Sequence, residues 1–139
     1  MAQTISDVMT PDPVVLAPTT SLTEAAARMR DLGIGDVLVA DDEQLRGLVT
    51  DRDIVVRAVA DGCDPNTTTL AEVCTAEVWA LDPDSSIDEA IRLMGENAIR
   101  RLPVVELGRP VGIVAIGDLA VQLDPTSALA DISAAAPTT

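Results

Sequence analysis

The sequence contains no histidine, lysine, phenylalanine or tyrosine, and Trp79 is its only aromatic residue. Without histidine the chain has no imidazole for acid–base catalysis, for activating a serine or cysteine nucleophile, or for an ordinary zinc site. Without lysine it has neither a Schiff-base residue nor the lysine of a phosphate-binding P-loop. We therefore expect a protein that is not an enzyme and that carries no metal and no cofactor.

Basic residues are also scarce, because 9 arginines stand against 23 aspartates and glutamates, which gives a net charge of −14. Such a surface repels nucleic acid and anionic lipid, and a single aromatic residue cannot form a stacking platform for unpaired bases. No apolar run approaches the roughly 18–20 residues that cross a bilayer. The segment Met1–Thr4 lacks the basic and apolar regions that begin a secretory signal. We predict a cytoplasmic protein that binds neither nucleic acid nor membrane.

The chain has only two cysteines, Cys63 and Cys74. Their spacing does not match the Cys-x-x-Cys motif of metal or redox sites. We expect two reduced thiols, with a disulfide or redox switch as the alternative, and assign no function to them.

An internal repeat is the main feature that is present: the chain matches itself, without a gap, at a constant offset of 65 residues. The two copies span roughly residues 5–57 and 70–122. We place two domains at 1–62 and 63–124, with a linker at about 61–69 and a tail at 125–139 that we expect to be frayed. Identical residues recur in register, as in the pairs Leu16/Leu81, Pro18/Pro83, Ser21/Ser86, Met29/Met94, Gly47/Gly112 and Asp53/Asp118.

A capping box predicts the start of the first helix in each copy, Ser21–Glu24 in the first and Ser86–Glu89 in the second. Apolar residues follow at positions i, i+3, i+4 and i+7, the spacing of a helix with one buried face, and Met29 and Met94 fall on that face. A second helix is predicted to begin at Thr50 or Asp51 and to run until Gly62.

Short apolar, β-branched runs at 14–17, 37–40 and 45–49 predict three strands, the last two joined as a hairpin. A turn of helix is expected before each copy, at 4–7 and at 69–72. Each copy is then a β-α-β-β-α unit of some fifty residues, too small to close a core alone. The predicted fold class is α/β (α+β), with two repeats packed as a pseudo-twofold pair.

The segment Gly47-Leu48-Val49-Thr50-Asp51-Arg52-Asp53 closes the last strand of the first copy. The second copy repeats it as Gly112-Ile113-Val114 with Asp118, preceded by Arg101-Leu102-Pro103-Val104-Val105. Found twice, in register, in a duplicated β-α-β-β-α unit, this pattern resembles the CBS domain family over nearly the whole chain. The stretch 50–68 is particularly similar to stand-alone CBS pairs of actinobacterial hypoxia- and stress-response proteins.

The resemblance implies a Bateman module, a regulatory pair that binds AMP, ATP, S-adenosylmethionine or NAD in a cleft between its halves. The carboxylate of Asp53 could accept both ribose hydroxyls, and Thr50 offers a hydroxyl beside helix N–H groups, a position suited to phosphate. The alternative is that Thr50 and Asp53 only cap their helix. By the family pattern the other copy completes this site, near the base with Val78 and Trp79 and near phosphate with Arg100 and Arg101.

The mirror site pairs Ala115 and Asp118 with Val14, Gly35 and Asp36. It lacks the threonine hydroxyl and has an acidic residue where the first site has arginine. Phosphate would be repelled there, so we predict one competent site and one that is degraded or empty.

The arginines have an alternative role on so acidic a chain. Arg100 and Arg101 could be surface ion-pair partners instead of phosphate ligands. We expect Arg52 and Arg57 to pair with neighbouring carboxylates and not to contact ligand. Trp79 is expected to alternate with Val78 along a strand, so that one of the two side chains faces the core and the other the cleft.

These observations favour a ligand sensor, expected to be a homodimer because family members usually associate through their helices, and acting on a downstream protein that the sequence does not identify. The alternative is a ligand-free CBS pair that works by docking to a partner, supported by the replacements at Ala115, Gly35 and Asp36. A carboxylate enzyme has no constellation of residues behind it.

Overall fold

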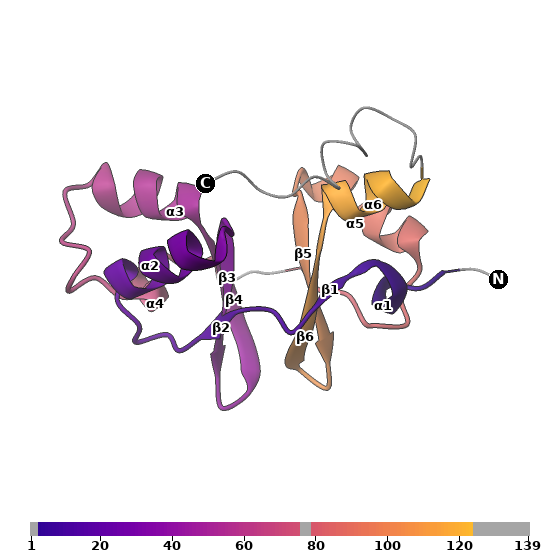
Figure 1. Ribbon diagram of the computed structural model, residues 1–139, viewed down its shortest axis with the longest axis horizontal. Helices are drawn as coiled ribbons and strands as arrows, with labels where there is room; N and C mark the ends of the chain where they lie inside the picture. The colour runs from indigo at the N-terminus through magenta and orange to yellow at the C-terminus, as the bar shows by residue number, and fades with distance from the viewer. Residues whose placement is uncertain (1–2, 76–78, 124–139) are drawn as a thin grey trace. The chain divides into compact units, whose positions relative to one another are not determined.

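The computed structural model describes residues 3–75 and 79–123, and it divides them into two compact units (Figure 1). We call residues 14–75 the internal unit, because one continuous stretch of chain forms it. Residues 3–13 and 79–123 form the composite unit, which combines the start of the chain with the second copy. The two units and the two sequence copies are different divisions of the chain.

The internal unit has a three-stranded sheet in the order β2-β3-β4, with β2 parallel and β4 antiparallel to β3. Its strands are β2 (Val15–Leu16), β3 (Asp36–Asp41) and β4 (Gln44–Thr50). The helices lie on one side of this sheet in Figure 1. They are α2 (Leu22–Leu32), α3 (Asp51–Ile54), the π-helical turn η1 (Val55–Val59) that continues it, and α4 (Leu70–Val73).

The composite unit repeats this plan with a sheet in the order β1-β6-β5, in which β6 is antiparallel to both neighbours. Its strands are β1 (Thr10–Pro11), β5 (Arg101–Glu106) and β6 (Arg109–Ala115). Its helices are α1 (Ile5–Val8), α5 (Ile87–Asn97) and α6 (Ile116–Leu123). The α/β class and the predicted hairpin of each copy are confirmed.

The predicted helix starts are confirmed by their caps. The hydroxyl of Ser21 accepts the Glu24 N–H at 3.2 Å, and the hydroxyl of Ser86 accepts the Glu89 N–H at 3.1 Å. Each bond satisfies one of the N–H groups that a helix leaves without an internal partner. Helix α2 ends at Gly33, whose φ of 65° lies in the left-handed region that glycine adopts at low cost.

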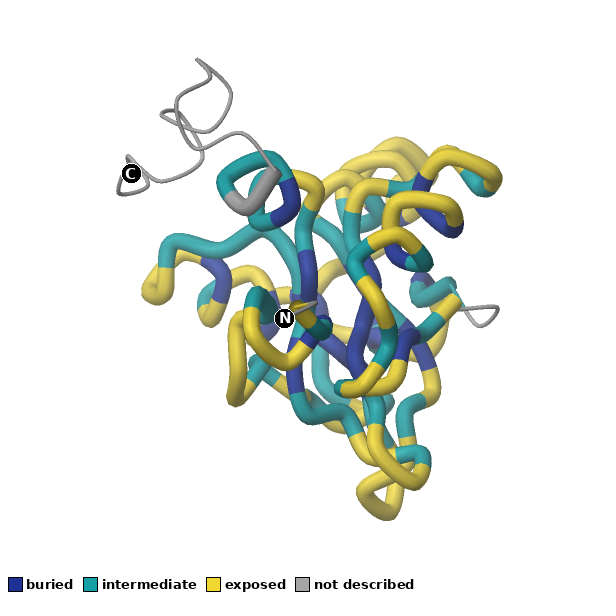
Figure 2. The backbone as a smooth tube through the Cα atoms, turned by 90° about the vertical axis from the view of Figure 1, so that its right-hand side faces the viewer, coloured by how far each residue is buried: buried dark blue, intermediate teal, exposed yellow. Residues whose placement is uncertain are grey.

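Each unit has its own apolar core, and the helices carry buried and exposed residues side by side (Figure 2). Met29 and Met94 are each 6% exposed, which confirms their predicted place on the buried faces. The internal core contains Leu22, Ala25, Met29, Val37, Val39, Val49, Ala58, Leu70 and Val73. The composite core contains Ile5, Leu81, Ala90, Leu93, Met94, Leu102, Val104, Val114 and Leu119.

Each copy begins with a short helix that packs against the core of the other copy. Helix α4 leads into the second copy but contributes Leu70 and Val73 to the internal core. Helix α1 leads into the first copy but contributes Ile5 to the composite core. Strand β1, which follows α1, pairs with β6 of the second copy. Each unit is therefore completed by the lead-in segment of the other copy.

The glycine of each motif makes room for an exchanged segment. A Cβ atom on Gly47 would lie 2.8 Å from the Thr75 carbonyl oxygen, and one on Gly112 would lie 3.0 Å from that of Thr10. Both separations are shorter than ordinary van der Waals contact. The lead-in segments thus run beside β4 and β6, the second strand of each hairpin, where a side chain would block them.

The first strand of the second copy is much reduced. Where the first copy has β2, the second forms a single parallel bridge between Leu81 and Val104. Trp79 lies outside any strand, and its side chain is 52% exposed. The expectation that Trp79 belongs to a strand is therefore wrong, and Val78, with which it was expected to alternate, lies outside the described residues.

Candidate functional site

The junction between β4 and α3 carries the motif residues Thr50 and Asp53. Thr50 is both the last residue of the strand and the N-cap of the helix. Its hydroxyl accepts the Asp53 N–H at 3.1 Å, and the Asp53 carboxylate accepts the Thr50 N–H through Oδ2 at 2.9 Å. This is a complete capping box. The capping role considered for these two residues is thus present in the structure.

Capping uses only part of the hydrogen-bonding capacity of this pair. The Asp53 side chain is 16% exposed, and its Oδ1 lies 3.8 Å from Nε of Arg57, an ion-pair distance longer than a hydrogen bond. Oδ1 can still accept a hydrogen bond, and the Thr50 hydroxyl, which acts as acceptor in the box, can still donate its proton. A ribose diol would meet one unshared carboxylate oxygen and one that is shared with the Thr50 N–H.

The equivalent junction of the second copy keeps half of this arrangement. The Ala115 N–H donates to Oδ2 of Asp118 at 2.8 Å, so the carboxylate is held by the backbone as in the first copy. Alanine has no hydroxyl to return the bond. Asp118 is therefore positioned like Asp53, and only the hydroxyl is lost.

The first residue of β3 or β5, and the residue before it, lie beside the junction in each unit. In the internal unit, Asp36 pairs with Thr50 across the hairpin, and the Gly35 carbonyl accepts the first N–H of α3 at 2.9 Å. In the composite unit, Arg101 pairs with Ala115. The Arg100 carbonyl there accepts the first N–H of α6 at 2.8 Å. Two arginines thus stand where the internal unit has a glycine and an aspartate.

The predicted site residues divide between the two units. Thr50 and Asp53 belong to the internal unit, whereas Trp79 and the two arginines belong to the composite unit. Val78 lies outside the described residues. Val14 is half-buried and packs against the internal core.

Arg57 lies one turn further along the helix and forms an ion pair with Asp53. The prediction that Arg57 pairs with a neighbouring carboxylate is confirmed. Its partner Asp53 lies at the i,i+4 spacing that favours ion pairs on a helix. A second contact was not predicted: Nη1 of Arg57 donates to the Val73 carbonyl at 3.1 Å. No side-chain pattern reveals a backbone acceptor in a distant segment.

Metal-binding clusters are not found in the described part of the chain: within 3–75 and 79–123, no group of three or more histidine, cysteine, aspartate or glutamate side chains could hold an ion. Cys63 and Cys74 are both free thiols. Among the same residues, no helix has the length and apolar character needed to cross a membrane.

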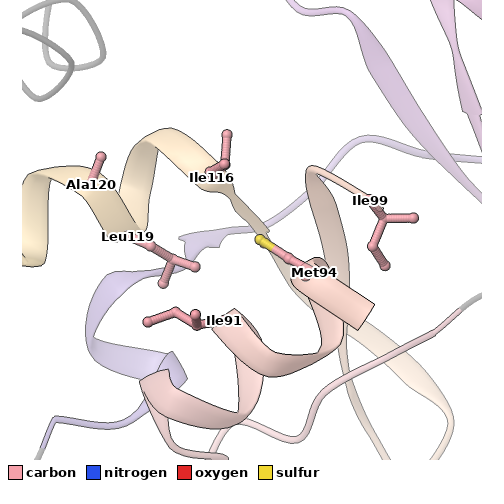
Figure 3. Close-up of a pocket in the computed structure, with 7 residues that line it drawn as sticks. Ile91, Met94, Ile99, Ile116, Leu119 and Ala120 are labelled. Atoms are coloured by element: carbon pink, nitrogen blue, oxygen red, sulfur yellow. The ribbon is translucent and has the colours of Figure 1, made fainter. Parts of the chain in front are cut away.

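An apolar groove of about 380 Å³ lies between α5 and α6 of the composite unit (Figure 3). Polar side chains that could orient a nucleotide are not part of its lining. The groove is lined by Ile91, Met94, Gly95, Ile99, Ile116, Leu119 and Ala120.

These features together define a duplicated α/β regulatory fold. The family model of the CBS domain matches the chain twice, over residues 5–59 and 70–124. The chain therefore belongs to the CBS domain family, as the motif predicted, and it is a CBS pair, a regulatory module.

The most informative relatives are a curated protein and two solved structures. Hypoxic response protein 1 of Mycobacterium tuberculosis is 39% identical over 121 residues, which cover 86% of this chain and 85% of that protein. The crystal structure of Hypoxic Response Protein I with two coordinated zinc ions has a TM-score of 0.78 and 38% identity, covering 86% of this chain and 98% of the other. The CBS pair of protein MJ0100, in complex with 5′-methylthioadenosine and S-adenosyl-L-methionine, has a TM-score of 0.81 and 26% identity, covering 91% of this chain and all of the other.

Proposed function

We propose that the chain is a non-enzymatic sensor that binds an adenosine-containing ligand, namely AMP, ATP, S-adenosylmethionine or NAD, at Thr50 and Asp53, and that passes its binding state to a downstream protein. The junction geometry supports this proposal most directly. The Asp53 carboxylate is held by the Thr50 N–H and is largely shielded from water. Little conformational free energy is therefore lost in ordering this side chain when a ligand binds. The bound adenosine derivatives of the MJ0100 pair support the same ligand class.

The family pattern supplies the rest of the proposed site from the second copy. Val78 and Trp79 would contact the base, and Arg100 and Arg101 would face phosphate. Arg100 is exposed, and Arg101 is half-buried at the start of β5. Arginine is the only cation that this chain can offer to an anion, because it has no lysine or histidine. For the mirror site at Ala115 and Asp118, we propose weak occupancy or none.

Isothermal titration calorimetry with AMP, ADP, ATP, S-adenosylmethionine and NAD tests the proposal. At least one of these should bind with a Kd below 1 mM, on the order of −4 kcal/mol or more favourable. Binding should also change the fluorescence of Trp79, the only tryptophan. If none binds at millimolar concentration, the sensor proposal fails and the chain is better described as an interaction module without ligand.

We also propose a homodimer that buries the apolar helix surfaces. On η1, Val55, Val56 and Val59 are 57%, 46% and 61% exposed, and Ile91 and Ile116 at the groove in Figure 3 are 39% and 48% exposed. Clustered apolar side chains at a surface are typical of protein interfaces. Sedimentation equilibrium should give twice the 14.5 kDa chain mass, and Val59→Glu should shift the protein toward monomer. A wild-type protein that stays monomeric at 100 μM would contradict this.

A further inference from the structure

One guanidinium group connects two separate parts of the internal unit. Nε of Arg57 lies 3.8 Å from Oδ1 of Asp53, on the preceding turn of the helix. Nη1 of the same side chain donates to the Val73 carbonyl, 16 residues further along the chain, at 3.1 Å. The rigid planar fork of arginine can serve two acceptors at once without giving up either. The position of Asp53 is therefore linked to the position of Val73.

Val73 is the last residue of α4, and the chain that follows it is closely fitted to the sheet. Thr75 bridges to Leu48 of β4, with its N–H 3.3 Å from the Leu48 carbonyl oxygen. The same short segment packs against Gly47 so closely that no side chain would fit at position 47. The carbonyl that Arg57 binds thus belongs to a short segment, residues 73–75, that is fixed against β4.

The second copy does not repeat this connection in its sequence. Gln122 occupies the position equivalent to Arg57, 65 residues later, although the aspartate of the motif is retained as Asp118. Glutamine has no charge with which to pair a carboxylate. The guanidinium link therefore belongs to the copy that we propose as the competent site.

We propose that Arg57 is a positioning residue of the adenosine site, which aims Oδ1 of Asp53 at the ribose and ties it to residues 73–75. This inference rests on the proposed function. The 3.8 Å separation holds the carboxylate by charge but leaves Oδ1 free to accept a ribose hydroxyl. Ligand at Asp53 tightens the Arg57 link, and the link carries that restraint to residues 73–75. Arg57 itself does not contact the ligand.

The test compares Arg57→Gln, which copies Gln122, with Arg52→Gln as a matched control. Arg52 lies on the same helix, is exposed, and loses the same charge when substituted. AMP, ADP, ATP, S-adenosylmethionine and NAD are titrated into each protein by calorimetry. Arg57→Gln should weaken binding about fivefold, whereas Arg52→Gln should leave the affinity unchanged. Arg57→Lys, which keeps the charge but not the two-pronged contact, should recover only part of the loss.

Amide hydrogen exchange at Cys74 and Thr75 separates positioning from simple stabilisation. In the wild type, ligand should slow exchange at these two amides. In Arg57→Gln saturated with the same ligand, this protection should be absent, while the unfolding midpoint in urea shows that the variant is folded. Unchanged affinity and unchanged protection in Arg57→Gln would overturn the inference and leave the proposed function standing. Failure of the wild type to bind any of the five compounds would instead overturn the proposed function, and the inference with it.

Discussion

The two strand-to-helix junctions of this chain hold an aspartate in the same way and surround it differently. In both, the backbone N–H of the residue that ends the strand donates to Oδ2 of the aspartate, at 2.9 Å for Asp53 and 2.8 Å for Asp118. In the first copy a threonine hydroxyl returns the bond, and in the second Ala115 does not. Asp36 lies across the hairpin from the first junction, and Arg101 lies across from the second.

This comparison separates the placement of the carboxylate from its chemistry. The backbone bond is enough to place the carboxylate, because the distance is conserved when the hydroxyl is missing. What differs between the copies is the hydroxyl donor, the neighbouring charge and the arginine one turn along the helix. A difference in ligand binding between the copies would therefore arise from these groups and not from a misplaced aspartate.

The largest difference is expected between Asp53→Ala and Asp118→Ala. Removing Asp53 deletes hydrogen bonds to a charged group worth about 1.5–3 kcal/mol each, so the affinity for the best ligand of the calorimetric panel should fall by about 100-fold or more. Asp118→Ala should change it by less than about twofold. Asp53→Asn retains a capping oxygen and so controls for damage to the helix start. Equal losses of affinity from both alanine variants would show that the two sites are equivalent, and would contradict the proposed difference between them.

The motif glycines should differ by a smaller amount. A Cβ atom on Gly47 would meet the backbone oxygen of Thr75, so Gly47→Ala should lower the free energy of unfolding in urea by about 2 kcal/mol. At Gly112 the closest atom is Sδ of Met9, which can move, so Gly112→Ala should cost about 1 kcal/mol. Gly95→Ala, in open space on α5, is the control and should stabilise the protein slightly. A larger cost at Gly112 than at Gly47 would contradict this account.

The smallest effect concerns the hydroxyl itself. Thr50→Ala should lower the free energy of unfolding by about 1 kcal/mol, because the Asp53 N–H loses its acceptor. Ala115→Thr builds the missing half of the box and should raise it by up to about 1 kcal/mol. Both changes are read from urea unfolding curves. If Ala115→Thr also adds a second binding event in calorimetry, the hydroxyl alone explains the difference between the two sites.

The local features of the fold could be predicted because their signals are local. Capping serines, apolar spacing and the strand pairs of each hairpin depend on residues that are close in sequence, and all of these are confirmed. The exchange of lead-in segments could not be predicted, because the 65-residue offset shows which segments are alike and not which of them pack together. Strand β1 has two residues, too few for a strand pattern, and exists only through its partner β6.

The candidate site, like the fold, could be predicted where its contacts are local in the sequence. Side-chain spacing indicated the capping box, since Thr50 and Asp53 lie within one turn of helix. A neighbouring carboxylate was expected as the partner of Arg57, and the structure identifies it as Asp53. The bond from Arg57 to the Val73 carbonyl escaped prediction because its acceptor is part of the backbone. Among the described residues of the first strand predicted for the second copy, Leu81 alone pairs with β5, so that strand was overestimated.

The exchanged lead-in helices also impose an order on folding during synthesis. The internal unit is one continuous stretch, so all of its described residues have been synthesised once the ribosome passes residue 75. Helix α1 and strand β1 are made first, yet their partner β6 ends only at Ala115. The beginning of the chain must therefore wait, unpaired, while the rest is made. A circular permutant that starts at Val14 and carries residues 1–13 after the second copy would remove that wait.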